Sequence, residues 1–136
     1  MTLLLLDTTF LIDAERGAAE LDRVISDDDD VAIAVVTLAE LAVGVKLADG
    51  RRRRDRQSFL DEIASSIPVV AYDERVAQQH AHLLVAVRRA GRPRGAHDLI
   101  IAATAAATGR TLVSADRSAF DDLPSVTAID HRPARD

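Results

Sequence analysis

The sequence contains no cysteine, which excludes disulfide bonds and thiolate ligands for metals. Any metal site must therefore be built from oxygen ligands or from histidine. Long apolar runs are missing as well: no uncharged stretch approaches the roughly 20 apolar residues that span a bilayer. The segment Met1–Asp7 also lacks the basic start of a signal peptide. We therefore expect no contact with membrane and a cytoplasmic location.

Aromatic residues make up only 3% of the chain, so an aromatic platform for stacking single-stranded bases is not expected. The formal net charge of -5 argues against a protein that coats nucleic acid by bulk attraction. The basic residues are nonetheless almost all arginine, because among 17 Lys and Arg residues only Lys46 is a lysine. Arginine can bind phosphate locally, so the net charge alone does not exclude a nucleic-acid ligand.

What the chain does contain is the composition of one folded domain. It has 136 residues, of which 48% are hydrophobic and 29% charged, enough for one core and too few for two separate ones. We expect a single domain over residues 1–130 and a frayed tail over residues 131–136.

Apolar stretches alternate between strand-like and helix-like patterns along the chain. This alternation predicts an α/β fold in which helices sandwich a mostly parallel sheet of about five strands. Two of the helices, 37–50 and 98–109, carry so few charges that we expect them to be buried on most sides. The predicted strands are 3–6, 31–36, 68–72, 111–114 and 126–130, and the remaining predicted helices are 8–15, 18–26, 51–67 and 73–90.

Four acidic residues occupy similar places relative to these elements. Asp7 directly follows the first strand, and Glu40 lies four residues after the second. Asp98 opens a helix, and Asp116 comes two residues after the strand at 111–114. Ligands of such sheets bind beyond the carboxyl ends of the strands, so all four could lie on one rim.

Each acid also has an ordinary structural explanation. Asp7 could cap a helix, Thr37 and Glu40 spell a capping box, Asp98 could complement a helix dipole, and Asp116 could form an Asx turn. Convergence would be costly without a cation, because two carboxylates about 4 Å apart repel by about 4 kcal/mol at an effective dielectric of 20. If the four acids meet, Mg²⁺ or Mn²⁺ is the expected occupant.

Four motifs, "LLDTTFLID", "TLAELAVG", "HDLIIAATA" and "LVSADRSAFDDL", occur in this order over essentially the whole chain. In order and spacing they resemble the PIN-domain ribonucleases, and specifically the VapC-type toxins of bacterial toxin-antitoxin pairs. The resemblance implies a PIN-like fold, Mg²⁺ or Mn²⁺ at a cluster of acids, endonucleolytic cleavage of RNA and inhibition by a small VapB-type antitoxin. It also implies a homodimer, with higher-order assembly when the antitoxin is bound.

By the same resemblance, Asp7, Glu40, Asp98 and Asp116 match the four catalytic and metal-binding acids of the family. Metal held by Asp7 and Asp98, with Glu40 and Asp116 binding directly or through water, would activate a water molecule for attack on a phosphodiester. The expected products are a 3'-hydroxyl and a 5'-phosphate.

Three further residues are weaker candidates for the same site. Thr9 and Ser114 match hydroxyl residues of the family motifs, although such residues near a helix start are commonly caps. Asp121, and likewise Asp122, could replace or supplement Asp116.

Two alternatives in other classes remain open. A phosphatase with Asp7 as nucleophile would resemble D-x-D at this point, whereas position 9 is Thr. A receiver-like, Mg²⁺-binding phosphoacceptor module would need a lysine at a strand end, whereas Lys46 is expected within a helix. Arginines at 51–56, and at 88, 89, 92 and 94, could bind RNA phosphate or could serve solubility alone. For His97, helix capping or simple exposure is the expected role.

Overall fold

The computed structural model describes residues 1–17 and 25–130. Most of the helix expected at 18–26, and the tail at 131–136, lie outside the described residues. Five strands form one sheet in the order β3-β2-β1-β4-β5, and every neighbouring pair is parallel. The expected five-stranded α/β fold is therefore confirmed. The strands are β1 (Leu3–Leu6), β2 (Asp30–Ala34), β3 (Val69–Val70), β4 (Thr111–Ser114) and β5 (Ala128–Asp130).

The leucine run of β1 is apolar on both faces because the strand lies in the middle of the sheet. Successive side chains of a strand point to opposite faces. Leu5 packs in one core and Leu4 and Leu6 pack in the other, and all three are at most 3% exposed.

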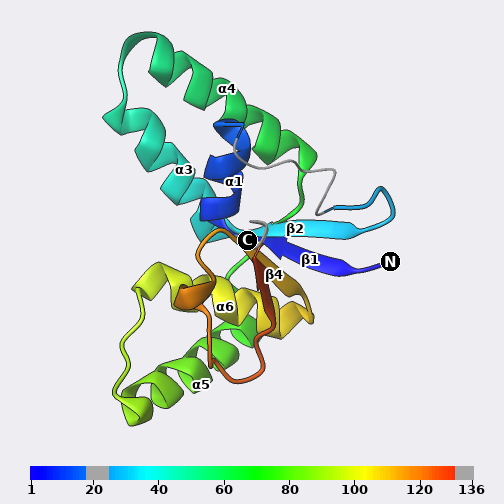
Figure 1. Cartoon of the computed structure of the whole chain (residues 1–136), viewed down its shortest axis with the longest axis vertical. Coiled ribbons are helices and arrows are strands. Elements are labelled where there is room, and N and C mark those ends of the chain that lie inside the picture. Colours follow the sequence, from blue (N-terminus) through cyan, green and yellow to red (C-terminus); the bar gives the residue numbers. More distant parts are fainter. Residues whose placement is uncertain (18–24, 131–136) are drawn as a thin grey trace, which may run out of the picture.

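Helices cover both faces of the sheet, as Figure 1 shows. One core joins the sheet to α5 and α6, and the other joins it to α1, α3 and α4. No helix in the described ranges has the length and apolar character needed to cross a membrane. The helices are α1 (Thr8–Glu15), α3 (Val35–Leu47), α4 (Gly50–Ser66), α5 (Glu74–Ala90) and α6 (Ala96–Thr108), with a short 3-10 turn at Arg117–Ala119.

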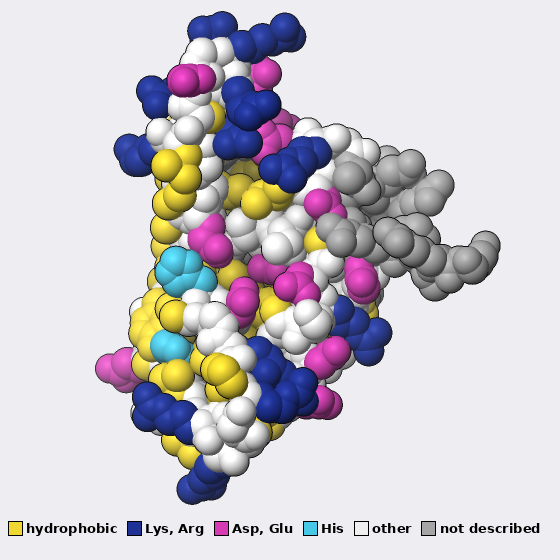
Figure 2. Space-filling view, turned by 60° about the vertical axis from the view of Figure 1, so that its left-hand side comes forward, with side chains coloured by type: hydrophobic (Ala, Val, Ile, Leu, Met, Phe, Trp, Pro, Cys, Tyr) yellow, Lys and Arg dark blue, Asp and Glu magenta, His cyan; other side chains and the backbone are white. Residues whose placement is uncertain are grey.

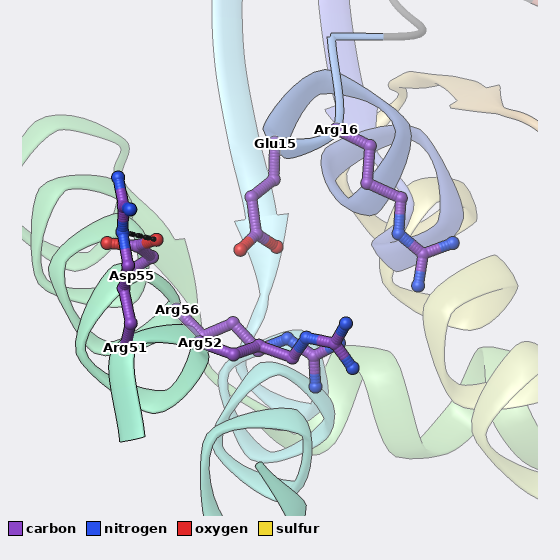
Figure 3. Close-up of a pocket in the computed structure, with 6 residues that line it drawn as sticks. All are labelled: Glu15, Arg16, Arg51, Arg52, Asp55 and Arg56. Carbon is purple, nitrogen blue, oxygen red and sulfur yellow. Dashed lines mark ion pairs between the residues drawn. The ribbon is translucent and has the colours of Figure 1, made fainter. Parts of the chain in front are cut away.

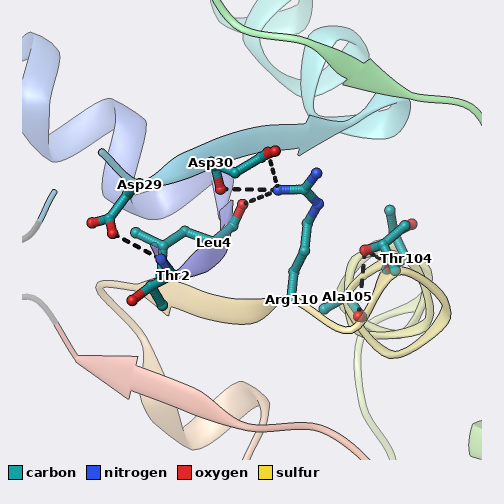
Figure 4. A network of polar contacts seen from close by, with 8 residues as sticks. Thr2, Leu4, Asp29, Asp30, Thr104, Ala105 and Arg110 are labelled. Carbon is teal, nitrogen blue, oxygen red and sulfur yellow. Dashed lines mark hydrogen bonds and ion pairs between the residues drawn. The ribbon is translucent and has the colours of Figure 1, made fainter. Parts of the chain in front are cut away.

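An arginine joins the strands at the end of the sheet opposite the candidate site (Figure 4). Arg110 Nη1 donates to the carbonyl oxygen of Leu4 at 3.2 Å and to that of Asp30 at 2.9 Å. It also meets Asp30 Oδ1 at 2.7 Å, and the arginine side chain is only 14% exposed. One residue just before β4 thus links β1 and β2.

The segment after β2 differs from the expectation in two ways. The strand ends at Ala34, so the β-branched pair at 35 and 36 begins α3. Helix α3 then ends at Leu47, and Gly50, which we expected to stop it, is the first residue of α4, with φ +56°. Local β propensity at Val35 is overridden because the chain leaves the sheet here.

The prediction that the helix at 37–50 is buried on most sides was wrong. Only Thr37 and Val45 of α3 are buried, whereas Val43 is 53% and Leu47 83% exposed. The reason is that α3 packs beside α4 and extends with it away from the sheet (Figure 1). Its remaining side has no neighbour in the described part of the chain. By contrast α6, over which Leu99 and 101–105 are buried, fulfils the expectation for 98–109 and begins two residues earlier, at Ala96.

Candidate active site at the carboxyl ends of the strands

Asp7 is fixed at the point where β1 becomes α1. Its side chain is 2% exposed, and Oδ1 accepts a hydrogen bond from the backbone N–H of Thr8 at 2.8 Å, which caps the helix. Oδ2 accepts from the hydroxyls of Thr9 and Ser114, each at 2.8 Å. The capping explanation therefore holds for one oxygen, and the other belongs to a network that bridges two strands. A buried carboxylate needs such donors, because leaving it unpaired is costly.

The two hydroxyls bind Asp7 and the backbone beyond β4. Ser114 Oγ accepts from the N–H of Asp116 at 2.9 Å, and Thr9 Oγ1 accepts from the N–H of Ala115 at 3.0 Å. The hydroxyls themselves lie 3.2 Å apart. The same network thus places Asp7 at the end of β1 and Asp116 after β4.

Glu40 reaches the site from the second turn of α3. Thr8 Oγ1 lies 2.9 Å from Glu40 Oε1 and 3.1 Å from Thr37 Oγ1, and both threonines are buried. The capping-box explanation for Thr37 and Glu40 was wrong: Ala34 is the N-cap residue, and no side chain caps this helix start. The other carboxylate oxygen of Glu40, Oε2, lies 3.8 Å from Nδ1 of His97. The side chain of His97 is exposed, as expected, but it lies beside the site.

Asp98 stands in the first turn of α6 and interacts electrostatically with all three other acids. Burial raises the pKa of the Asp98 carboxyl, and the negative charges of Asp7, Glu40 and Asp116 raise it further; His97 opposes them. Asp7, Glu40 and Asp116 are therefore each close enough to repel Asp98. Figure 2 shows several acidic side chains at mid-height on one face of the molecule. Gly95 leaves room for Asp98, since a Cβ at position 95 would lie 3.0 Å from Asp98 Oδ2.

Asp116 is the exposed member of the group, and its Oδ1 accepts from the hydroxyl of Ser118. The expected auxiliary residue Asp121 instead pairs with Arg117 at 3.4 Å. Asp122 pairs with Arg92 at 3.0 Å. Neither is among the charges that raise the pKa of Asp98.

The donor set of the site is chemically suited to a hard divalent cation, because it offers carboxylate and hydroxyl oxygens and no sulfur. The charges of Asp7, Glu40 and Asp116 point the same way: after burial, they are what raises the pKa of Asp98, and a cation at this place would offset their repulsion. As the side chains stand, no three acidic or histidine residues in 1–17 and 25–130 form a ready-made cage for an ion. Metal binding would therefore require carboxylates to turn, and the partly exposed Glu40 and Asp98 and the exposed Asp116 have room to do so.

Two residues important to this geometry, Thr8 and Thr37, were not predicted as site residues, and Thr37 was considered only as part of a capping box. The consecutive threonines after Asp7 were a usable signal, because Thr8 contacts Glu40 whereas Thr9 contacts Asp7. For Thr37 no comparable signal existed, since its partner is 29 residues away.

A family model described as PIN domain matches residues 4–125. The chain belongs to the PIN-domain family. Among relatives, ribonuclease VapC5 of Mycobacterium tuberculosis is 34% identical over 126 residues, covering 91% of this chain and 92% of the relative. Ribonuclease VapC4 of the same species is 31% identical over 125 residues, covering 92% and 94%. These matches confirm the resemblance to VapC-type PIN domains.

Solved structures agree with this assignment. The VapBC-5 structure of M. tuberculosis, from the VapBC family of toxin-antitoxin systems, has a TM-score of 0.80 and 33% identity, covering 96% of this chain and 99% of that one. The VapBC2 structure of Rickettsia felis bound to a promoter DNA fragment has a TM-score of 0.85 at 22% identity, covering 95% and 98%. The second likeness speaks for the PIN fold alone.

Proposed function

We propose that this PIN domain is a Mg²⁺- or Mn²⁺-dependent endoribonuclease that acts in the cytoplasm as the toxin of a toxin-antitoxin pair. The observation that carries the proposal is the gathering of four carboxylates beyond the carboxyl ends of β1, β2 and β4, where three of them act on the pKa of the fourth. Relatives that share about a third of the sequence over nearly the whole chain are named ribonucleases, which supports the same reaction class.

Each acid has a defined role in this proposal. Asp7 and Asp98 bind the ion, and Glu40 and Asp116 bind it directly or through water. When bound, the ion supplies activation of a water molecule and stabilisation of charge on the phosphoryl oxygens. Thr9 and Ser114 hold Asp7, and Thr8 holds Glu40. Attack by water, with no part for the ribose 2'-hydroxyl, leaves a 3'-hydroxyl and a 5'-phosphate.

The proposed protein partner is a small VapB-type antitoxin, because the VapBC-5 structure, at 33% identity, is described as a member of the VapBC family of toxin-antitoxin systems. We also propose a homodimer that forms larger assemblies with the antitoxin. The exposed apolar residues Val43 and Leu47 of α3 support this, since such side chains usually gain a partner in an assembly.

Cleavage of total RNA with Mg²⁺, Mn²⁺ or a chelator, mapped by sequencing the new ends, tests the reaction. Wild type should cut with either ion, should leave 5'-phosphates, and should stop in chelator. The Asp7→Asn protein should be inactive, whereas the control Asp61→Asn, on the exposed face of α4, should cut normally. Unchanged cleavage in chelator, or by Asp7→Asn, would refute the proposal. Co-expression with its VapB-type antitoxin should suppress cleavage.

The alternatives of a phosphatase and a receiver-like module gain no support. A receiver-like module would need a lysine at a strand end, but Lys46 is exposed in the last turn of α3, away from the strand ends. A phosphatase would need a second acid at position 9, where the hydroxyl of Thr9 instead donates a hydrogen bond to Asp7. Incubation with a phosphoryl donor separates these possibilities from a nuclease, because a stable aspartyl phosphate would favour the alternatives.

A further inference from the structure

A second concave site lies between the end of α1 and the start of α4. It is a hollow of about 860 Å³ (Figure 3). Four of its six lining residues are arginines, so the hollow is basic in a protein whose net charge is -5. The lining residues are Glu15, Arg16, Arg51, Arg52, Asp55 and Arg56.

The four arginines of the hollow outnumber its two acids, Glu15 and Asp55, so the lining carries a net positive charge. Arg51 pairs with Asp55 at 3.9 Å. Arg16 and Arg52 form no ion pair with any carboxylate in the described ranges. In Figure 3 the side chains of Arg52 and Arg56 run alongside each other from α4, and Arg16 approaches from the end of α1. Like charges held close together without a counter-ion provide a site for an anion.

Arg56 is held in place by the backbone. Its Nη1 donates to the carbonyl oxygen of Gly44 at 2.8 Å, and its remaining N–H groups are not used in this bond. Arg53, from the same basic run, is committed to the end of α3, where its Nε donates to Ala48 O at 2.7 Å. The basic run therefore contains both structural arginines and arginines that are free to bind a ligand.

The hollow adjoins the acidic site. A smaller pocket of about 200 Å³ shares Glu15, Arg16 and Arg56 with the hollow and also includes Glu40. Its remaining lining is mostly apolar, from Ile12, Leu41, Gly44, Phe59 and Leu60. A path along the surface thus leads from an acid of the cleavage site to uncompensated arginines.

We propose that this hollow binds phosphate of the RNA strand next to the bond that is cut, with Arg16, Arg52 and Arg56 as the binding residues. The inference rests on the proposed ribonuclease function and adds to it the contact that holds the flanking strand. A nucleic-acid strand carries a phosphate at every nucleotide, so it can place one at the acids and another among the arginines. An acidic peptide could bind the arginines, but it has no phosphate to place at the acid cluster.

The test measures RNA binding and leaves cleavage aside. An inactive Asp98→Asn protein provides the background, and fluorescence anisotropy gives its dissociation constant for a labelled single-stranded 12-mer over a range of salt. Arg16→Gln and Arg52→Gln are combined, because both side chains are exposed and neither makes a structural bond among the described residues. The control combines Lys46→Gln on α3 with Arg75→Gln on α5. Both side chains are exposed and lie outside the lining of the hollow, and the net charge changes equally.

Each phosphate contact on a single strand contributes about 0.7 to the slope of log affinity against log salt. Loss of two contacts should lower the slope by about 1.4. If the parent and the variant bind equally at 1 M salt, the variant should therefore bind about 25-fold more weakly than the parent at 0.1 M. The control pair should change both quantities much less.

Equal weakening in both double variants would overturn the proposal, because it would show only bulk charge. Unchanged RNA binding together with loss of antitoxin inhibition in Arg16→Gln/Arg52→Gln would also overturn it and would assign the hollow to an acidic segment of the antitoxin. These results can be told apart from a failure of the ribonuclease proposal. If that proposal failed, the wild-type protein would not cut RNA, whatever the binding measurements showed.

Discussion

Replacing Ser114 with alanine should disturb both the stability and the activity of the protein through a single buried carboxylate. The hydroxyl of Ser114 is fully buried and donates to Asp7 Oδ2 at 2.8 Å, while it accepts from the N–H of Asp116 at 2.9 Å. In Ser114→Ala the carboxylate keeps Thr8 N and Thr9 Oγ1 as donors, and the N–H of Asp116 loses its acceptor.

The expected loss of stability follows from these bonds. A hydrogen bond to a charged group contributes about 1.5–3 kcal/mol, and an unpaired N–H adds about 1 kcal/mol, so the free energy of unfolding should fall by about 2.5–4 kcal/mol. Unfolding entropy of about 2.1 cal/mol/K per residue over 136 residues makes 1 kcal/mol equivalent to about 3.5 °C. The melting temperature should therefore fall by about 9–14 °C. Cleavage should fall by about 10- to 100-fold, as for other residues that orient a metal ligand.

Urea and thermal unfolding of the metal-free protein measure the first effect. Ser118→Ala is the matched control, because that hydroxyl also binds an aspartate but is exposed, and its loss should cost less than about 0.5 kcal/mol. A double-mutant cycle with Asp7→Asn locates the cause, since the cost of Ser114→Ala should shrink when the charge at position 7 is absent. Equal costs for the two serines, or the same cost in the Asp7→Asn background, would refute the reasoning.

Three further outcomes are expected. In metal-free protein, the raised pKa of Asp98 means that the folded state binds the carboxyl proton more tightly than the unfolded state does. The free energy of unfolding should therefore fall as pH rises through that pKa. Urea midpoints measured from pH 4 to 8 should fall less steeply for Asp98→Asn than for wild type. Arg110→Met removes the link between β1 and β2 and should lower the free energy of unfolding by about 2 kcal/mol in urea titrations, against less than about 0.5 kcal/mol for the exposed Arg75→Met. Arg53→Ala removes the side-chain donor of the Lys46 and Ala48 carbonyls at the end of α3 and should lower the melting temperature by several degrees in calorimetry, whereas Arg54→Ala should not.

The sequence predicts the sheet well because its signals are local. The leucine run that ends at Asp7 predicts a strand buried on both faces. The charge-free stretch after Asp98 predicts a helix buried on most sides. The expected positions of Asp7, Glu40 and Asp116 follow from strand ends, and that of Asp98 follows from the start of a helix. Their mutual influence on Asp98 could be suspected from the sequence but needed the fold to be seen.

The failures concern interactions between distant segments. Nothing near Val43 or Leu47 indicates that α3 leaves the sheet and exposes these residues, since an apolar sequence looks the same whether it meets a core or a partner. Gly50 is ambiguous in the same way, because glycine can end one helix or begin the next. The division of the basic run at 51–56 into structural and free arginines likewise depends on carbonyl groups of α3.

The most direct test of cation binding by the four acids is the melting temperature of wild type and Asp98→Asn as Mn²⁺ is added to metal-free protein. If four carboxylates gather to hold a cation, wild type at about 100 times the dissociation constant should gain about 2.7 kcal/mol, close to 9 °C. Asp98→Asn should gain little and should begin from a melting temperature at or above that of metal-free wild type. Equal responses of the two proteins, or none in wild type, would contradict a cation site at these acids.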